Sequence, residues 1–216
     1  FLPAQTNYLK VYKNNSVVYQ EEITAIDSII FVSIEYIEEG VAINGIVWAT
    51  RNVGAHGTFV TNPEDAGMFY QWNRNVGWSS TDPMTNSNGG TTWDTSTPAG
   101  STWEESNNVC PTGWRVPTQA ELQSLEASGS TWTTINGKTG RIFGTEPNTI
   151  FLPATGYRSM NNGELINPAT RGDYWSSTTY TSGPDYASDL FFADSFIQVS
   201  SNSHRKYGIS VRCVAE

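Results

Sequence analysis

Two cysteines, Cys110 and Cys213, are the residues of this chain best suited to covalent chemistry. They lie far apart in the sequence, so a disulfide between them would close a long loop and stabilise the fold by about 4 to 5 kcal/mol in a chain-entropy estimate. The alternative is a pair of reduced, buried thiols, and the number of cysteines alone does not decide between the two. The composition is typical of an exported protein, and an oxidising compartment favours the disulfide.

Side chains for nucleophilic or general acid–base catalysis are scarce. His56 and His204 are the only histidines, and neither lies near the G-x-S-x-G sequence that positions a hydrolase serine. We interpret Arg115, Arg158 and Arg212 as partners of carboxylates in structural ion pairs, because charged networks of this kind are common outside active sites. We therefore predict no catalytic residues, no cofactor and no enzymatic activity.

Tryptophans are the strongest candidates for ligand binding. Trp78, Trp93 and Trp103 are spread over residues 73–109, which are rich in Gly, Ser, Thr and Asn and have almost no aliphatic side chains. An exposed tryptophan can stack on a sugar ring or anchor a protein contact, while Asn, Ser and Thr bond to hydroxyl groups. We predict that this segment binds the ligand through these tryptophans. The alternative is a compact loop that folds its own tryptophans onto the domain.

The elements that must position these residues include one well-marked helix. Thr118 and Glu121 have the spacing of a capping box, in which each side chain bonds to the backbone amide of the other residue. Leu122 and Leu125 then place one apolar stripe on the inner face. We predict a helix that begins after Thr118 and ends by residues 128–129.

Strands are predicted from alternating apolar residues and from the Gly, Pro and Asn residues between them. Asn136-Gly137 is the strongest hairpin signal, and residues 62–65 are predicted to begin a short helix that runs through Trp72. Trp48, Trp114 and Trp175 lie in strand-like segments and should be buried. The predicted extended segments are 8–13, 16–20, 26–37, 41–53, 114–116, 132–143 (as a hairpin), 150–153, 190–192, 196–199 and 208–214. We divide the chain into a small N-terminal β segment, 1–39, and a main domain, 40–216.

The composition and charge exclude several classes of partner. Only 15% of the residues are charged, and the net charge is −9. Nucleic-acid binding requires clustered Lys and Arg, so we predict no nucleic-acid partner, and a membrane surface is disfavoured for the same reason. No apolar run is long enough to cross a bilayer, and no signal-peptide pattern is present at Phe1. We therefore interpret the sequence as that of a mature or truncated chain.

Several sequence motifs resemble the Fibrobacter succinogenes major paralogous domain, which occurs in secreted proteins and surface lipoproteins of Bacteroidetes-type bacteria. The motifs occur in the family order and cover about residues 40–216. They are CPTGWRVPTQAEL at 110–122, FLPATGYR at 151–158, YWSST at 174–178 and GISVRCV at 208–214, with weaker matches at 46–48 and 67–72.

That family is similar to the C-type lectin-like fold and to formylglycine-generating enzymes. The resemblance implies an α+β, C-type-lectin-like domain that is loop-rich, with short antiparallel strands and few helices. It also implies that Cys110 pairs with Cys213, since a cysteine beside the helix commonly pairs with the last strand in these folds. The formylglycine-generating enzymes bind copper through closely spaced cysteines before the final strand, and this chain has none there. The resemblance thus argues against that oxidase activity.

Calcium is the metal for which the sequence contains a partial binding motif. Glu146-Pro147-Asn148 spells the tripeptide with which sugar-binding C-type lectins bind calcium, but residues 189–192 replace their Trp-Asn-Asp motif. We therefore predict no metal site and interpret the tripeptide as a turn. Other carboxylates in or beside loops, without EF-hand spacing, are Asp65, Asp82, Asp94 and Asp194.

These observations predict a non-enzymatic binding or adhesion module that is secreted or anchored to the cell surface. The ligand would be a glycan or a host protein. The alternative is a structural or adhesive subunit of a surface assembly that makes only protein contacts. The resemblance also implies a lipid anchor attached through an N-terminal signal that has been removed.

Overall fold

The computed structural model of the chain describes residues 8–13, 16–22, 40–180 and 183–216. The chain divides into two compact units, Phe1–Ile37 and Glu38–Glu216. In the first unit, β1 (Tyr8–Lys13) pairs antiparallel with β2 (Ser16–Glu22), and the register shifts between Val11 and Tyr12. The predicted first two strands are thus confirmed. The predicted third strand, 26–37, lies outside the described residues.

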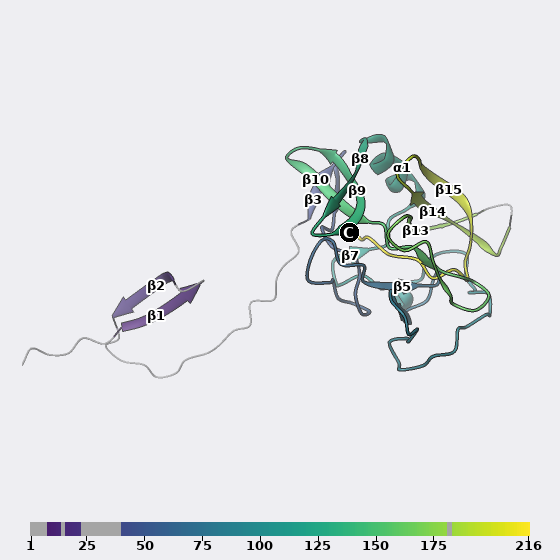
Figure 1. Cartoon of the computed structure of the whole chain (residues 1–216), viewed down its shortest axis with the longest axis horizontal. Coiled ribbons are helices and arrows are strands. Elements are labelled where there is room, and N and C mark those ends of the chain that lie inside the picture. The colour runs from purple at the N-terminus through teal and green to yellow at the C-terminus, as the bar shows by residue number, and fades with distance from the viewer. Residues whose placement is uncertain (1–7, 14–15, 23–39, 181–182) are drawn as a thin grey trace, which may run out of the picture. The chain divides into compact units, whose positions relative to one another are not determined.

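The main unit is a loop-rich α+β structure of many short strands, in agreement with the predicted class (Figure 1). Its described part contains one α-helix, α1 (Gln119–Ala127), and one 3-10 helix, η1 (Glu105–Asn107). The strands are β3 (Val41–Ile43), β4 (Ile46–Trp48), β5 (Met68–Tyr70), β6 (Gly77–Ser79), β7 (Trp114–Arg115), β8 (Ser130–Ile135), β9 (Lys138–Thr145), β10 (Asn148–Pro153), β11 (Tyr157–Arg158), β12 (Leu165–Ile166), β13 (Gly172–Thr179), β14 (Tyr186–Phe192), β15 (Ile197–His204) and β16 (Val214–Ala215).

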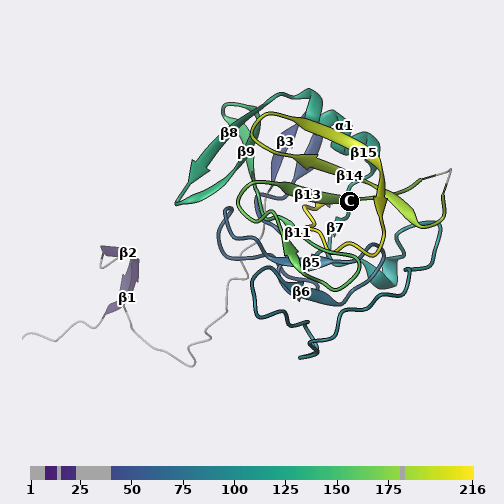
Figure 2. The same ribbon diagram turned by 45° about the vertical axis from the view of Figure 1, so that its right-hand side comes forward.

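These strands form several small antiparallel sheets rather than one large sheet. A four-stranded sheet has the order β3-β4-β16-β7, so the last strand lies between β4 and the strand that precedes the helix. Two three-stranded sheets have the orders β10-β9-β8 and β13-β14-β15. Figure 2 shows β13, β14 and β15 side by side, and α1 contacts all three.

Two main hydrophobic clusters hold the sheets together. One contains Trp72, Trp175 and both cysteines, and the other packs Leu122 and Leu125 of α1 against Trp48 and the aromatic rings of β13 and β14. The predicted burial of three tryptophans is confirmed, because the rings of Trp48, Trp114 and Trp175 are at most 9% exposed.

The predicted helix start is confirmed. The Thr118 hydroxyl accepts a hydrogen bond from the Glu121 amide, and a Glu121 carboxylate oxygen accepts one from the Thr118 amide at 2.7 Å. The helix ends where predicted, with Ser128 as its C-cap and Gly129 at positive φ.

Loss of this cap is expected to destabilise the main unit modestly. Thr118→Ala should lower the free energy of unfolding by about 0.5 to 2 kcal/mol, because the Glu121 amide loses its acceptor. Thr118→Ser keeps the hydroxyl and should stay close to wild type. Urea unfolding of the three proteins measures the difference. Equal stability of the alanine and serine variants would contradict the role of the cap.

Three predicted elements are wrong, each because tertiary pairing decides between alternatives that the sequence allows. Residues 41–53 are not one strand: Asn44 and Gly45 both have positive φ and form the turn between β3 and β4. Residues 62–72 are not a helix, because Asp65 closes a turn on Asn62 and the buried residues that follow pair with β6.

The third correction concerns residues 208–214. Only Val214–Ala215 forms a named strand, β16. The preceding residues are strand-like but pair one at a time with different segments, through bridges of Gly208 to Arg158, Ile209 to Tyr70 and Ser210 to Tyr174. This segment thus joins sheets instead of extending one.

Candidate functional site

A groove of about 360 Å³ lies where the end of the irregular segment 73–109 meets β7, the start of α1 and the end of β13. One wall is Trp103 with Glu104 and Glu105, which belong to the irregular segment. Asn108 of the same segment also lines the groove, and the rest of the lining comes from other parts of the chain, among them Arg115, Val116, Thr118 and Ser177. It thus combines an aromatic ring, carboxylates, a guanidinium and hydroxyl groups.

Trp103 is held in a defined orientation at this groove. Its indole Nε1 donates a hydrogen bond of 2.8 Å to the Asn107 carbonyl, and its ring lies edge-on to Trp72 with 5.6 Å between centroids. The Asn73 side chain accepts a hydrogen bond from the Glu104 amide and so fixes the chain just after Trp103. Trp103 is half-buried, so part of its surface remains available in the groove.

Arg115 contributes a positive charge that is already paired. Its Nη1 and Nη2 donate to the two carboxylate oxygens of Glu121 at 2.9 and 2.6 Å. Because Glu121 also completes the cap of α1, the helix start fixes the arginine in place. The hydrogen bond from Arg115, together with those from Thr118, lowers the pKa of Glu121 and keeps the pair ionised.

The predicted site tryptophans do not share one environment. Trp78 and Trp93 are only 2% and 6% exposed, and their rings lie 4.7 Å apart in a cluster with Phe69. Glycine at 208 permits this packing, because a Cβ there would come within 2.7 Å of the Trp93 ring. The prediction that Trp78 and Trp93 are exposed on a recognition surface is therefore wrong. Of the three tryptophans, only Trp103 reaches the groove.

The disulfide predicted between Cys110 and Cys213 is present, and both residues are buried. It ties the end of the irregular segment to the residue that precedes β16. The Cys213 carbonyl also accepts a hydrogen bond of 2.9 Å from the Ala49 amide beside β4. Since Asn108 lines the groove two residues before Cys110, the disulfide anchors one edge of the groove to the core sheet.

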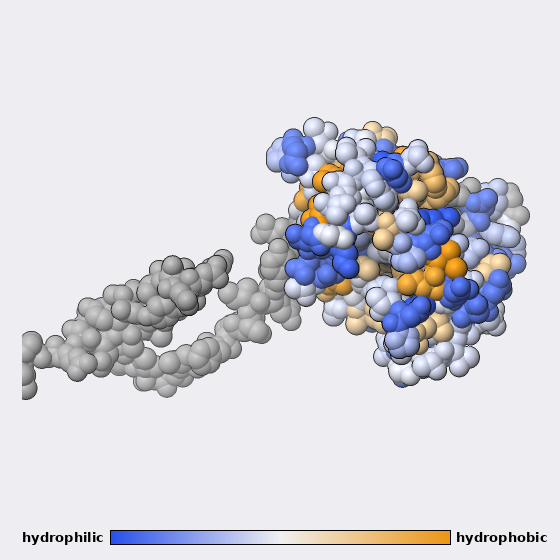
Figure 3. All heavy atoms as spheres, in the orientation of Figure 1, coloured by the Kyte–Doolittle hydropathy of each residue, from blue (hydrophilic) through white to orange (hydrophobic). Residues whose placement is uncertain are grey.

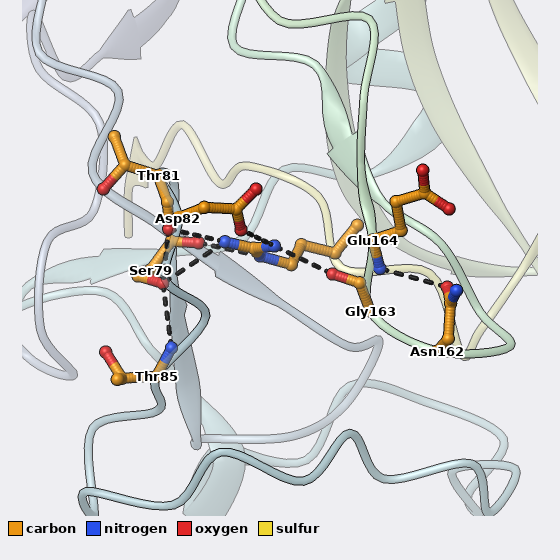
Figure 4. Close-up of polar contacts among 8 residues, drawn as sticks. Ser79, Thr81, Asp82, Thr85, Asn162, Gly163 and Glu164 are labelled. Atoms are coloured by element: carbon orange, nitrogen blue, oxygen red, sulfur yellow. Dashed lines mark hydrogen bonds and ion pairs between the residues drawn. The ribbon is translucent and has the colours of Figure 1, made fainter.

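Arg158 fastens residues 79–82, near the start of the irregular segment, and Figure 4 shows Ser79, Thr81 and Asp82 gathered there opposite Gly163. This side chain is 1% exposed, and it donates to the Ser79, Thr81 and Gly163 carbonyls at 2.9, 2.7 and 2.8 Å. It also donates to a carboxylate oxygen of Asp82 at 2.9 Å. The interpretation of Arg115 and Arg158 as ion-pair partners of carboxylates is confirmed. Arg212 donates to the Asn52 side chain and to the Ala49 and Phe151 carbonyls.

The remaining charged residues of the described part of the chain include the histidines and the carboxylates considered as metal ligands. No group of three or more His, Cys, Asp or Glu in the described residues is arranged to hold a metal ion. Glu146-Pro147 forms the turn between β9 and β10, as predicted for this tripeptide. His204, at the end of β15, packs its ring against Tyr186 at 5.3 Å, and it does not line the groove.

Two buried aspartates on the β13-β14-β15 sheet are the most perturbed carboxyl groups. Asp173 is paired with Arg171, whose guanidinium lies over the Tyr157 and Phe191 rings. Asp189 is fully buried, and its carboxylate oxygens make no hydrogen bond of ordinary geometry among the described residues, although the nearby Ser203 side chain offsets part of the rise in its pKa. Burial, reinforced by the nearby Asp173 charge, raises the pKa of Asp189 to about 8, while burial raises that of Asp173 to about 6 despite its pairing with Arg171.

The raised pKa of Asp189 makes the free energy of unfolding depend on pH in a defined direction. Between about pH 4 and 8, Asp189 is protonated when folded but ionised when unfolded, so stability should fall as the pH rises through this range. The slope from this one group is up to about 1.4 kcal/mol per pH unit. Asp189→Asn cannot ionise, so the difference in unfolding free energy in favour of the variant should grow from about pH 4 and level off above about pH 8.

Urea unfolding from pH 4 to 9 measures this prediction. Asp194→Asn is the matched control, since Asp194 is exposed on the same unit and its replacement should keep the wild-type slope. A wild-type slope in the Asp189→Asn protein would show that Asp189 is not the group responsible.

The groove includes residues that sequence reasoning did not select as site residues. Glu104 and Glu105 carried a signal, because they directly follow a tryptophan predicted to bind ligand. Arg115 and Ser177 carried none, since they lie in other segments and only the fold brings them to Trp103.

Comparison with known protein families identifies the family of this chain. The model of the family described as the Lcl C-terminal domain matches residues 45–215, which is most of the chain and all of the groove except Glu216. No curated protein and no solved structure matches the chain significantly. No helix in the described residues is long and apolar enough to cross a membrane.

Proposed function

The chain belongs to the Lcl C-terminal domain family, and from this premise we propose that it is a non-enzymatic binding or adhesion module, secreted or anchored to the cell surface. Its ligand-binding site is the groove beside Trp103, and the ligand is a glycan or a host protein. Trp78 and Trp93 act as the supporting core of the same segment and do not touch the ligand.

The observation that carries this proposal is the partly exposed, immobilised ring of Trp103 at a groove with polar walls. A ligand that meets a fixed ring loses less conformational entropy of the site than one that must order a loose side chain. The groove volume of about 360 Å³ lies at the small end of the range for ligand pockets. Carboxylates, hydroxyls and an amide around an aromatic ring suit the recognition of a polar ligand with an apolar face.

The fold and location that we propose go further than the family match. We propose that the main unit is a C-type-lectin-like domain related to the Fibrobacter succinogenes major paralogous domain. The Cys110–Cys213 disulfide supports an oxidising, extracytoplasmic location, because structural disulfides are rare in reducing compartments. Attachment through an N-terminal lipid is part of the same proposal.

Replacement of Trp103 tests the proposal. Trp103→Ala should weaken binding to any glycan or surface that wild type binds by at least tenfold, because large aromatic anchors at the centre of a site commonly contribute more than 1 kcal/mol. A glycan array and a surface-attachment assay measure this. Trp132→Ala is the matched control, since Trp132 is also half-buried but packs on Phe192 away from the groove.

Circular dichroism must show that both variants are folded. Equal loss of binding in the two variants would reject the groove as the site. The alternative function, a structural subunit with protein contacts only, predicts no saccharide hit for wild type but retained attachment to a protein-coated surface.

A further inference from the structure

We propose that the groove receives an arginine side chain from a partner protein, with its guanidinium between Glu104 and Glu105 and its aliphatic stem along Trp103 and Val116. This inference rests on the proposed function and specifies the ligand of the same groove.

The first argument is the charge balance of the groove. Glu104 and Glu105 line it, both residues are exposed, and neither takes part in the ion pairs found among the described residues. The positive side chain that lines the groove, Arg115, is neutralised by its bidentate pair with Glu121. The groove therefore has a surplus of negative charge, on a chain whose net charge is −9. An anionic occupant is disfavoured, and a cationic one is attracted.

The second argument is the aromatic wall. A guanidinium stacks on tryptophan more readily than an ammonium does, and it offers a planar fork of donors that matches carboxylate oxygens. A tryptophan next to Trp103 already stacks with an arginine, because the Arg205 guanidinium lies 4.2 Å from the centre of the Trp72 ring, which in turn contacts Trp103. The protein itself thus uses the stacking proposed for the ligand, here and where Arg171 lies over two aromatic rings.

The third argument is the shape and polarity of the groove. Its volume of about 360 Å³ suits one long side chain with its neighbouring backbone better than an extended polymer. Buried Val116 provides apolar surface for an aliphatic stem, while Asn108, Thr118 and Ser177 provide acceptors or donors for backbone groups. Neutral sugars would leave both carboxylates without a charged partner, so the observations favour a polypeptide.

A large apolar area that could serve as a competing binding site is not seen among the coloured residues on the face drawn in Figure 3. On the face shown in Figure 3, hydrophilic and weakly hydrophobic residues are mixed and the strongly hydrophobic patches are small and separate. Among the described residues, the exposed large hydrophobic side chains are Tyr186 and Phe196.

The test compares two small probes that differ in charge. Arginine amide and citrulline amide have nearly the same shape, but the citrulline side chain is neutral. Titration at low ionic strength, followed by the NMR signal of the Trp103 indole N–H, should give a dissociation constant at least tenfold lower for arginine amide. Added salt should weaken the binding of arginine amide.

Variants connect this preference to the two carboxylates. The double variant Glu104→Gln/Glu105→Gln should bind arginine amide at least tenfold more weakly than wild type. The Glu104 side chain makes no capping hydrogen bond to η1, so this change removes charge without removing a cap. The matched control is Glu164→Gln, an exposed glutamate that does not line the groove, and it should bind as wild type does.

Equal affinity for citrulline amide and arginine amide would overturn the inference, as would unchanged affinity in the double variant. These failures are distinguishable from failure of the proposed function. If Trp103→Ala abolishes glycan or surface binding while the two probes bind equally, the groove is the site but its ligand is not arginine.

Discussion

Replacement of Arg158 by methionine is expected to destabilise the main unit by about 3 to 5 kcal/mol. The guanidinium donates to three backbone carbonyls and to Asp82, and its side chain is almost completely buried. The hydrogen bond to Gly163 is buried and those to Ser79 and Thr81 are partly buried. A fully buried acceptor that loses its donor costs about 1 to 3 kcal/mol and a partly buried one less, whereas the pair with the exposed Asp82 adds little. The expected loss therefore comes from the carbonyls that Arg158 satisfies and not from the ion pair.

Arg158→Lys provides a second measurement of the same idea. Lysine keeps the charge and most of the length, but it lacks the planar fork that reaches the carbonyls of residues 79, 81 and 163 together. Most of the stability should therefore be lost in this variant too. A lysine variant as stable as wild type would mean that charge, and not the geometry of the donors, is what the site requires.

Arg74→Met is the matched control, because Arg74 also fastens the irregular segment, through Asp94 and Ser96 near the surface. Its loss should cost less than about 1 kcal/mol. Urea unfolding, followed by tryptophan fluorescence, measures all three variants. A cost below about 1 kcal/mol for Arg158→Met would show that water replaces the guanidinium without penalty.

Removal of the disulfide is expected to have an effect of similar size. The double variant Cys110→Ser/Cys213→Ser should be less stable than wild type by about 2 to 5 kcal/mol, because the 103-residue separation makes the closed loop long. Reduced wild type should unfold at nearly the same denaturant concentration as the double variant. Peptide mapping without reductant should yield the cross-linked Cys110 and Cys213 peptides.

The groove makes the disulfide prediction more specific. Asn108 lies two residues before Cys110 and lines the groove, so reduction should loosen this edge before the rest of the main unit unfolds. Hydrogen exchange should therefore increase at residues 103–109 under reducing conditions that leave the β13-β14-β15 sheet protected. Unchanged exchange at these residues, or no difference in overall stability, would mean that the loop is held by its packing alone.

The local elements of this protein are those that the sequence predicts best. The capping box at Thr118, the Asn136-Gly137 hairpin and the β1-β2 hairpin depend on hydrogen bonds and backbone preferences of neighbouring residues, and all are confirmed. Residues 41–53, wrongly predicted as one strand, contain conflicting local signals. Asn44-Gly45 carries the same turn signal as Asn136-Gly137, but the apolar residues on both sides were interpreted as one strand.

The features of the candidate site also separate into those that residue types predict and those that depend on the fold. Residue types and positions are enough to show that Cys110 and Cys213 are suited to a disulfide and that Trp103 lies beside two carboxylates. The burial of Trp78 and Trp93 and the half-exposure of Trp103 become apparent only in the folded chain, because all three lie in one polar segment. The reason is that burial depends on tertiary contacts, such as the close approach of Gly208 to Trp93, whereas Trp103 lines an open groove together with residues from other segments. Such contacts leave no periodic or local pattern in the sequence around the tryptophans.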